Sequence, residues 1–275
     1  MKTLLILVFS PVIGGLIEGA FRKVNARMQT RVGPPIVQPF YDLLKLLQKR
    51  PILINNYHVL MAYAHFVLMA TALATFLLGG DLLLVIFFHG MSLAFLAMGA
   101  YSLRSAYSHV GATRELFHIL AVEPPLLLIA VNIYMNTGTF LLSDVFETQR
   151  LVKIMPFSFL ALIASLPGML RRSPFDVSEA HQEIIGGPEI EYSGPFYAPI
   201  YLAKWLEKVL VAAFIGIFFL GSPLIVVAIA TSFILVLALD NSTARLSYWD
   251  MVKITWVVAL PLVGANIFLN AQGVL

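Results

Sequence analysis

The sequence predicts an all-α polytopic membrane protein with about eight transmembrane helices and one amphipathic surface helix. Three observations support this class. Of the 275 residues, 59% are hydrophobic and only 12% are charged, about half the charged share of a soluble domain. The mean hydropathy is +0.86. The apolar runs are continuous rather than alternating, which excludes outer-membrane strands. This composition excludes a soluble enzyme or a disordered chain.

Runs free of acidic and basic residues define the spans, each of which needs about 20 apolar residues. The run 209–239 is too long for one helix, and we divide it at Gly221-Ser222-Pro223, a turn signal. The first run is expected to be a retained span rather than a signal peptide, because Pro11 and Glu18 interrupt it. The expected helices are 2–21, 57–79, 82–103, 115–136, 153–170, 197–220, 223–240 and 252–272.

An amphipathic surface helix is expected between the first two spans. Its apolar side chains recur at helical spacing, and its charged ones are expected on the opposite face. The apolar positions are Phe40, Leu43, Leu44 and Leu47, and the charged ones are Asp42, Lys45 and Lys49.

Lysine and arginine gather on one side of these spans, thirteen against three. The three on the sparse side are Lys2, Arg150 and Lys153. The basic side should be cytoplasmic, which places the chain in the cell membrane with both termini outside. We expect a single membrane domain, 1–275, with cytoplasmic loops 22–56, 104–115, 171–196 and 241–252.

Ionisable residues within the spans are the strongest functional signal. They persist in membranes where they pair or line a hydrated path. Glu123 needs a partner from another helix, because only His118 lies nearby on its own helix. Lys204 and Glu207 are three residues apart and can form a structural pair, or can belong to a proton or cation path. Asp240 ends the seventh helix. The chain has no cysteine, no metal-spaced histidine pair, no phosphate loop and no nucleophile elbow, so we expect no metal site, redox centre or catalytic group here.

Three motifs in the loops resemble the family of the H subunit of NADH–quinone oxidoreductase, the enzyme also called complex I. They are Arg27-Met-Gln-Thr-Arg31-Val-Gly33-Pro34 with Asp42 and Lys45 beyond it, Arg114 with Glu123, and Arg172-Ser-Pro-Phe-Asp176 continuing through Glu179 and Glu183 to Glu191. The resemblance implies a membrane component at the junction of a redox arm and a membrane arm. It implies a cytoplasmic junction formed by these loop residues: Arg27, Arg31, Asp42, Lys45, Arg172, Asp176, Glu179, Glu183 and Glu191. Glu123, Lys204, Glu207, Arg114 and Asp240 would form the ion path.

Departures from that family favour one branch of it. Phe21 precedes Arg22, Pro35 stands where asparagine is usual, and His181 and Lys204 replace glutamates. These resemble the membrane-bound [NiFe] hydrogenase branch and its sulfur-reducing archaeal relatives. The resemblance implies a ferredoxin-linked complex that pumps H⁺ or Na⁺ and reduces protons, sulfane or polysulfide sulfur.

The expected partners are hydrogenase-like large and small subunits and antiporter-like membrane subunits. Iron–sulfur clusters would lie in those partners, together with nickel–iron in the hydrogenase case. The alternatives are a quinone-site subunit, a free-standing secondary transporter and a scaffold without coupling. No nucleic acid is expected, since the net charge is only +3.

Overall fold

The structure, a computed structural model, describes residues 2–148 and 151–272, and the described residues form helices and no strands. Arg150 and the two chain ends, which entered the orientation prediction, lie outside the described residues. The long helices are α1 (Lys2–Met28), α3 (Asn56–Leu77), α4 (Leu82–Tyr101), α5 (Ala106–Thr137), α8 (Pro156–Met169), α10 (Ala198–Phe218), α11 (Ile225–Ser242) and α12 (Tyr248–Ala271). The short ones are α2 (Gln38–Gln48), α6 (Leu142–Val145), α7 (Leu151–Ile154), α9 (His181–Ile184), η1 (Gly187–Glu189) and η2 (Gly194–Phe196).

Each of the eight expected helices has a long helix at its position, so the all-α prediction is confirmed. In the described part of the chain, five helices are long and apolar enough to cross a membrane: α3, α4, α5, α11 and α12. Helix α8 has only 14 residues. The number of spans therefore stays a prediction.

Three predicted loop boundaries are wrong. Helix α1 continues to Met28, and α5 begins at Ala106 rather than at 115. The predicted loop 104–115 is thus mostly helix. The predicted loop 241–252 is shorter, because α11 ends at Ser242 and α12 begins at Tyr248. In each case the helix continues beyond its apolar run, because charged side chains at a helix end do not stop the backbone from coiling.

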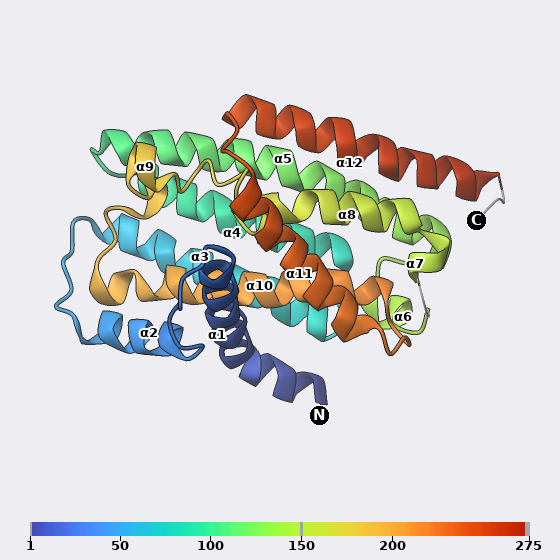
Figure 1. The fold of residues 1–275 in the computed structure, drawn as a ribbon, viewed down its shortest axis with the longest axis horizontal. Coiled ribbons are helices and arrows are strands. Elements are labelled where there is room, and N and C mark those ends of the chain that lie inside the picture. The colour runs from blue at the N-terminus through green and yellow to red at the C-terminus, as the bar shows by residue number, and fades with distance from the viewer. Residues whose placement is uncertain (1, 149–150, 273–275) are drawn as a thin grey trace.

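The helices form one bundle whose two ends differ (Figure 1). Helices α2 and α9 lie at one end of the long axis, and α6, α7 and the end of α12 lie at the other. Helix α4 packs between α3 and α5, while α10 packs against α3 and α1, and α12 against α5 and α8. Trp205, Met69, Leu93 and Leu126 are among the fully buried side chains of this core.

Helix α2 forms as expected and docks on α1, α10 and η2. The Phe40 ring meets Trp205 of α10 with ring centroids 5.2 Å apart. Leu44 and Leu47 are exposed in the isolated chain, as the apolar side of a helix on the membrane surface would be. One detail differs from the prediction: Asp42 turns toward the bundle to bind Arg22. A specific ion pair outweighs the helical pattern at that position.

Helix α5 carries two consecutive prolines, Pro124 and Pro125, directly after Glu123. Proline has no N–H, so the carbonyls four residues earlier lose their usual helical donors. The Trp256 side chain of α12 donates a hydrogen bond of 3.0 Å from Nε1 to the Leu120 carbonyl. The two helices are therefore joined at the turn that precedes Glu123.

Neutral amides join the helices at the end that carries α6 and α7. Asn266 Oδ1 accepts hydrogen bonds from the backbone N–H groups of Phe157 and Ser158, at 3.0 and 3.3 Å, and so caps the start of α8. Asn132 donates to the Ser158 hydroxyl at 2.6 Å. Asn270 donates to the side-chain oxygen of Asn136 at 3.1 Å. These contacts fix α12 against α5 and α8.

Candidate functional site

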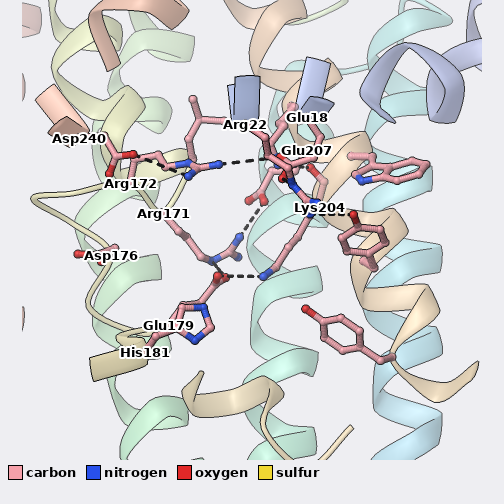
Figure 2. A pocket seen from close by; sticks show the side chains of 15 residues that line it. Glu18, Arg22, Arg171, Arg172, Asp176, Glu179, His181, Lys204, Glu207 and Asp240 are labelled. Atoms are coloured by element: carbon pink, nitrogen blue, oxygen red, sulfur yellow. Dashed lines mark hydrogen bonds and ion pairs between the residues drawn. The ribbon is translucent and has the colours of Figure 1, made fainter. Parts of the chain in front are cut away.

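A charged cavity of about 310 Å³ opens between α1, α10 and the segment that follows α8. Figure 2 shows the side chains that line it, several of them joined by ion pairs. Five are acidic and five are basic: Glu18, Asp176, Glu179, Glu207 and Asp240 on one hand, Arg22, Arg171, Arg172, Lys204 and Lys208 on the other. The formal charges therefore balance. Tyr197 and Tyr201 also line the cavity.

Arg171 is the buried centre of the site. It follows α8 in a left-handed backbone conformation, φ 47°, and its N–H and that of Arg172 bond back to Gly168 and Pro167 at 2.9 Å each. This is the helix ending that usually takes glycine. A side chain there costs about 1–2 kcal/mol, so the cluster that Arg171 joins must offset that strain.

The Arg171 guanidinium joins three carboxylates from different elements. Its Nη2 is 2.9 Å from Glu115 Oε1 of α5, its Nη1 is 2.7 Å from Glu207 Oε2 of α10, and its Nε is 3.6 Å from Glu179 Oε1. Glu115 is fully buried. Removing the arginine would leave uncompensated charge in the bundle, which is far more costly than a missing surface pair.

Lys204 pairs with two carboxylates of the loop rather than with Glu207. Its Nζ lies 2.9 Å from Glu179 Oε2 and 2.8 Å from Glu189 Oε2, and the Tyr197 hydroxyl donates to that same Glu189 oxygen at 2.9 Å. The predicted Lys204–Glu207 pair is wrong, because each member has closer opposite charges on neighbouring elements. Lys204 is neutralised by acids brought in by the loop.

The two loop carboxylates around Lys204 differ in proton affinity. Burial opposes ionisation of Glu179, but Lys204 and Arg171 outweigh it and lower its pKa. Burial, together with the nearby Glu179 charge, raises the pKa of Glu189 despite Lys204. Glu189 is therefore the group of this pair that more readily holds a proton.

Close backbone packing brings these acids into the bundle. Gly187 of η1 crosses Gly111 of α5, and a Cβ on Gly111 would lie only 2.5 Å from the Gly187 Cα. Gly187 also has a φ of 53°. Only glycine allows both the approach and the conformation.

A second chain of ion pairs links the cavity to α2. Lys208 Nζ lies 3.2 Å from Glu18 Oε2, and Glu18 Oε1 accepts from Arg22 Nε at 2.9 Å. Arg22 Nη1 in turn binds Asp42 at 2.7 Å, and its Nη2 donates to the Tyr201 hydroxyl at 2.9 Å. Glu18, one helical turn before Arg22, is therefore the carboxylate that this arginine binds within α1.

Glu123 finds its partner on another helix, as its position predicted. Its Oε1 is 2.7 Å from Nδ1 of His89 on α4. On the other edge of the ring, Nε2 is 3.5 Å from Glu207 Oε1. His89 is 1% exposed, whereas the Glu123 side chain is 13% exposed. The imidazole of His89 therefore lies between Glu123 and Glu207.

A further cluster on the surface fastens the loop beside the cavity. Arg245 makes a two-pronged contact with Asp176, at 2.9 and 2.6 Å, and Glu183 bridges Arg245 at 3.3 Å and Arg114 at 2.6 Å. The hydrogen bond from Arg114, reinforced by Arg245, lowers the pKa of Glu183. The bond to Asp176 raises the pKa of Arg245.

Several sequence-predicted residues meet in the structure and others do not. Glu179, Lys204, Glu207, Asp240, Arg172 and Asp176 all line the charged cavity. Arg114 binds Glu183 at the surface and lies nine residues from Glu123, about 13 Å along the helix. Arg27, Arg31 and Lys45 are exposed. Glu191 lies next to Tyr192, whose ring stacks on His58.

Sequence reasoning missed Glu115, His89, Arg171, Glu189, Glu18 and Lys208 as site residues. The expected helix 115–136 begins at Glu115, whereas α5 begins nine residues earlier. His89 carried a signal that could have found it, since it lies in the middle of the strongly apolar helix α4. Among the described residues, no cluster of three or more potential ligands is arranged to hold a metal ion.

Fold and site together define a polytopic helical membrane protein with a buried, charge-balanced cavity near one end of its bundle. Residues 1–271 match the family model described as NADH dehydrogenase. The H subunit of the NADH-quinone oxidoreductase of Anoxybacillus flavithermus is 29% identical over 98% of this chain and 91% of its own length. That of Rickettsia bellii is 30% identical over 74% of this chain and 68% of its own.

A solved structure carries the same fold. It belongs to the membrane-bound sulfane sulfur reductase, an archaeal respiratory membrane complex, with a TM-score of 0.89, 23% identity and 98% of both chains covered. The present chain belongs to the NADH dehydrogenase family, and the resemblance to the H subunit predicted from its loops is confirmed.

Proposed function

We propose that this chain anchors and couples a complex I-like, ferredoxin-linked redox complex that pumps ions. Electron transfer in a docked peripheral arm would change the charge or conformation of the loop that carries Asp176, Glu179 and Glu183. That change would shift protonation along the buried groups as far as Glu123. The chain itself would contribute no redox centre.

The observation that carries this proposal is the continuity of the ionisable groups. Ion pairs and hydrogen bonds connect loop residues Glu189 and Glu179, through Lys204 and Arg171, to Glu207. The His89 ring then lies between Glu207 and Glu123. Charges this close in a low-dielectric interior strongly affect one another's protonation. A change of charge or conformation in the loop can thus shift the protonation of Glu123.

The lining of the cavity favours the hydrogenase and sulfur-reductase branch over quinone reduction. Ligand sites for apolar molecules are mostly hydrophobic with a few polar groups. Here ten of the fifteen lining residues are acidic, lysine or arginine, and they are already paired. The likeness in fold to the sulfane sulfur reductase also supports the hydrogenase and sulfur-reductase branch.

We propose that the end bearing α2 and α9 faces the cytoplasm, since it carries the basic excess. The hydrogenase-like subunits would dock there. Antiporter-like membrane subunits would lie against the side of the bundle where Glu123 is partly exposed, because an ionisable group facing lipid is costly unless it is covered.

The test is Glu123→Gln in the intact complex, reconstituted into vesicles and driven with a reduced ferredoxin-type donor. The amide keeps the size of the side chain and removes its titration. We expect assembly to be retained and ion uptake per electron to fall by about tenfold or more. Glu147→Gln, at an exposed glutamate near α6 and α7, is the matched control and should change neither quantity.

Other results would overturn parts of this proposal. Unchanged ion uptake in Glu123→Gln would make the chain a scaffold. Quinone-dependent turnover that is sensitive to quinone-site inhibitors would favour quinone reduction instead. A chain that purifies without partners would return the secondary transporter to consideration.

A further inference from the structure

His89 is the only imidazole, among the described residues, that lies between two carboxylates. The ring is 1% exposed, in the middle of α4. Nδ1 is 2.7 Å from Glu123, a full hydrogen bond, whereas Nε2 is 3.5 Å from Glu207. Neither His89 Nε2 nor Glu207 Oε1 has a hydrogen-bond partner. Two buried polar atoms thus face each other across a short gap.

Such a gap is unfavourable because a buried polar atom without a partner loses its hydration. A small rotation of the imidazole or of the Glu207 carboxyl would close it. Glu207 cannot leave, because its other oxygen is held at 2.7 Å by Arg171. The contact between His89 and Glu123 is therefore formed, whereas a small movement would make or break the one between His89 and Glu207.

We propose that His89 carries the proton between Glu207 and Glu123, an assignment that rests on the ion-path function proposed above. With the gap closed, protonated Glu207 gives its proton to Nε2, and the ring becomes an imidazolium. The Nδ1 proton then passes to the Glu123 carboxylate. The ring is left neutral with its proton on Nε2, and it regains the starting tautomer by reorientation. One proton enters and one leaves, and no electron is transferred.

The surroundings fit a carrier rather than a simple structural contact. Gly90, next to His89, leaves room for Glu123, since a Cβ there would lie 3.2 Å from the Glu123 carboxyl carbon. Besides Glu123 and Glu207, the ionisable groups close enough to influence the ring include His118 of α5, together with Arg171 beyond Glu207. No other group bridges the two carboxylates among the described residues.

The experiment compares two buried histidines in the reconstituted complex. His65 of α3 is equally buried and binds the Ser92 carbonyl at 2.9 Å, but it touches no carboxylate. We expect proton uptake per electron, followed with a pH-sensitive dye, to fall by about tenfold or more in His89→Gln, since positioned proton transfer contributes about 10²–10⁴-fold to rates. His65→Gln should keep its uptake.

A second readout separates proton carrying from packing. In His89→Ala, added imidazole should restore uptake, because it can occupy the space of the lost ring and exchange protons at both nitrogens. In Gly90→Ala, which removes no titratable group, crowding of Glu123 should also reduce uptake. Loss of uptake that imidazole does not restore would make His89 a structural residue and overturn the proposal.

The outcomes distinguish this inference from the function on which it rests. Normal uptake in His89→Gln alongside loss in Glu123→Gln would reject the carrier and leave the ion path standing. Normal uptake in both would reject the ion path itself. Equal losses in His89→Gln and His65→Gln would indicate a general packing defect and would likewise reject the carrier.

Discussion

The two ends of the bundle differ in the kind of polar side chain that they bury. Near α2 and α9, charged side chains surround a cavity. Near α6 and α7, they are neutral amides that bind backbone groups and each other. Amides satisfy buried donors and acceptors without titrating, whereas carboxylates, lysine and histidine can gain or lose protons. One end is therefore suited to fixing helices and the other to responding to charge.

The largest effect that would sharpen this contrast is expected from Arg171→Met. The change leaves Glu115 and Glu207 buried without their shared cation. Removing one member of a buried ion pair costs about 3–5 kcal/mol. Thermal unfolding of the detergent-solubilised complex should show a large loss of stability, and Glu115→Gln combined with Arg171→Met should recover part of it. Equal stability of Arg171→Met and wild type would mean that water already screens the site.

A smaller effect is expected at the amide end, from Asn266→Leu. This substitution keeps the volume but removes the acceptor for the first N–H groups of α8. An unsatisfied buried donor costs about 1–3 kcal/mol. Stability should fall by that amount at every pH between 5 and 8, and ion uptake should be retained. A loss of uptake as large as that in Glu123→Gln would break the proposed division of labour between the two ends.

The smallest effect is expected from Glu183→Gln on the surface. The pKa of Glu183 is lowered in the folded protein. The stability that comes from its ion pairs with Arg114 and Arg245 is therefore fully present above the ordinary glutamate pKa of about 4.3. It is lost as the pH falls through the lowered value. The side chain is 46% exposed, so the pair contributes at most about 0.5 kcal/mol.

Limited proteolysis of segment 171–196 measures that contribution. In wild type, cleavage should increase as the pH falls below about 4. In Glu183→Gln it should be slightly faster at neutral pH and should show a smaller acid-dependent increase, because Asp176 still binds Arg245. An identical pH dependence in both proteins would show that another group anchors the loop.

Local patterns predicted the helices well and the site only in part. Apolar runs located all eight long helices because burial in lipid demands them along the whole span. The need for Glu123 to find its partner on another helix was also readable, since its own helix offers none. The Lys204–Glu207 pair failed because spacing reports only neighbours on one helix. Their real partners, Glu189 and Arg171, lie on a loop whose path depends on close glycine packing and a left-handed helix ending. Such tertiary features have no local period in the sequence.

The proline pair in α5 places a requirement on a distant position. Without the N–H of Pro124, the Leu120 carbonyl depends on a donor from another helix, and residue 256 supplies it. A phenylalanine there would fill similar space yet offer no N–H. Position 256 thus contributes a hydrogen bond as well as bulk. Relatives that keep both prolines should keep a donor at that position, while those that lose Pro124 are free to carry any large apolar side chain.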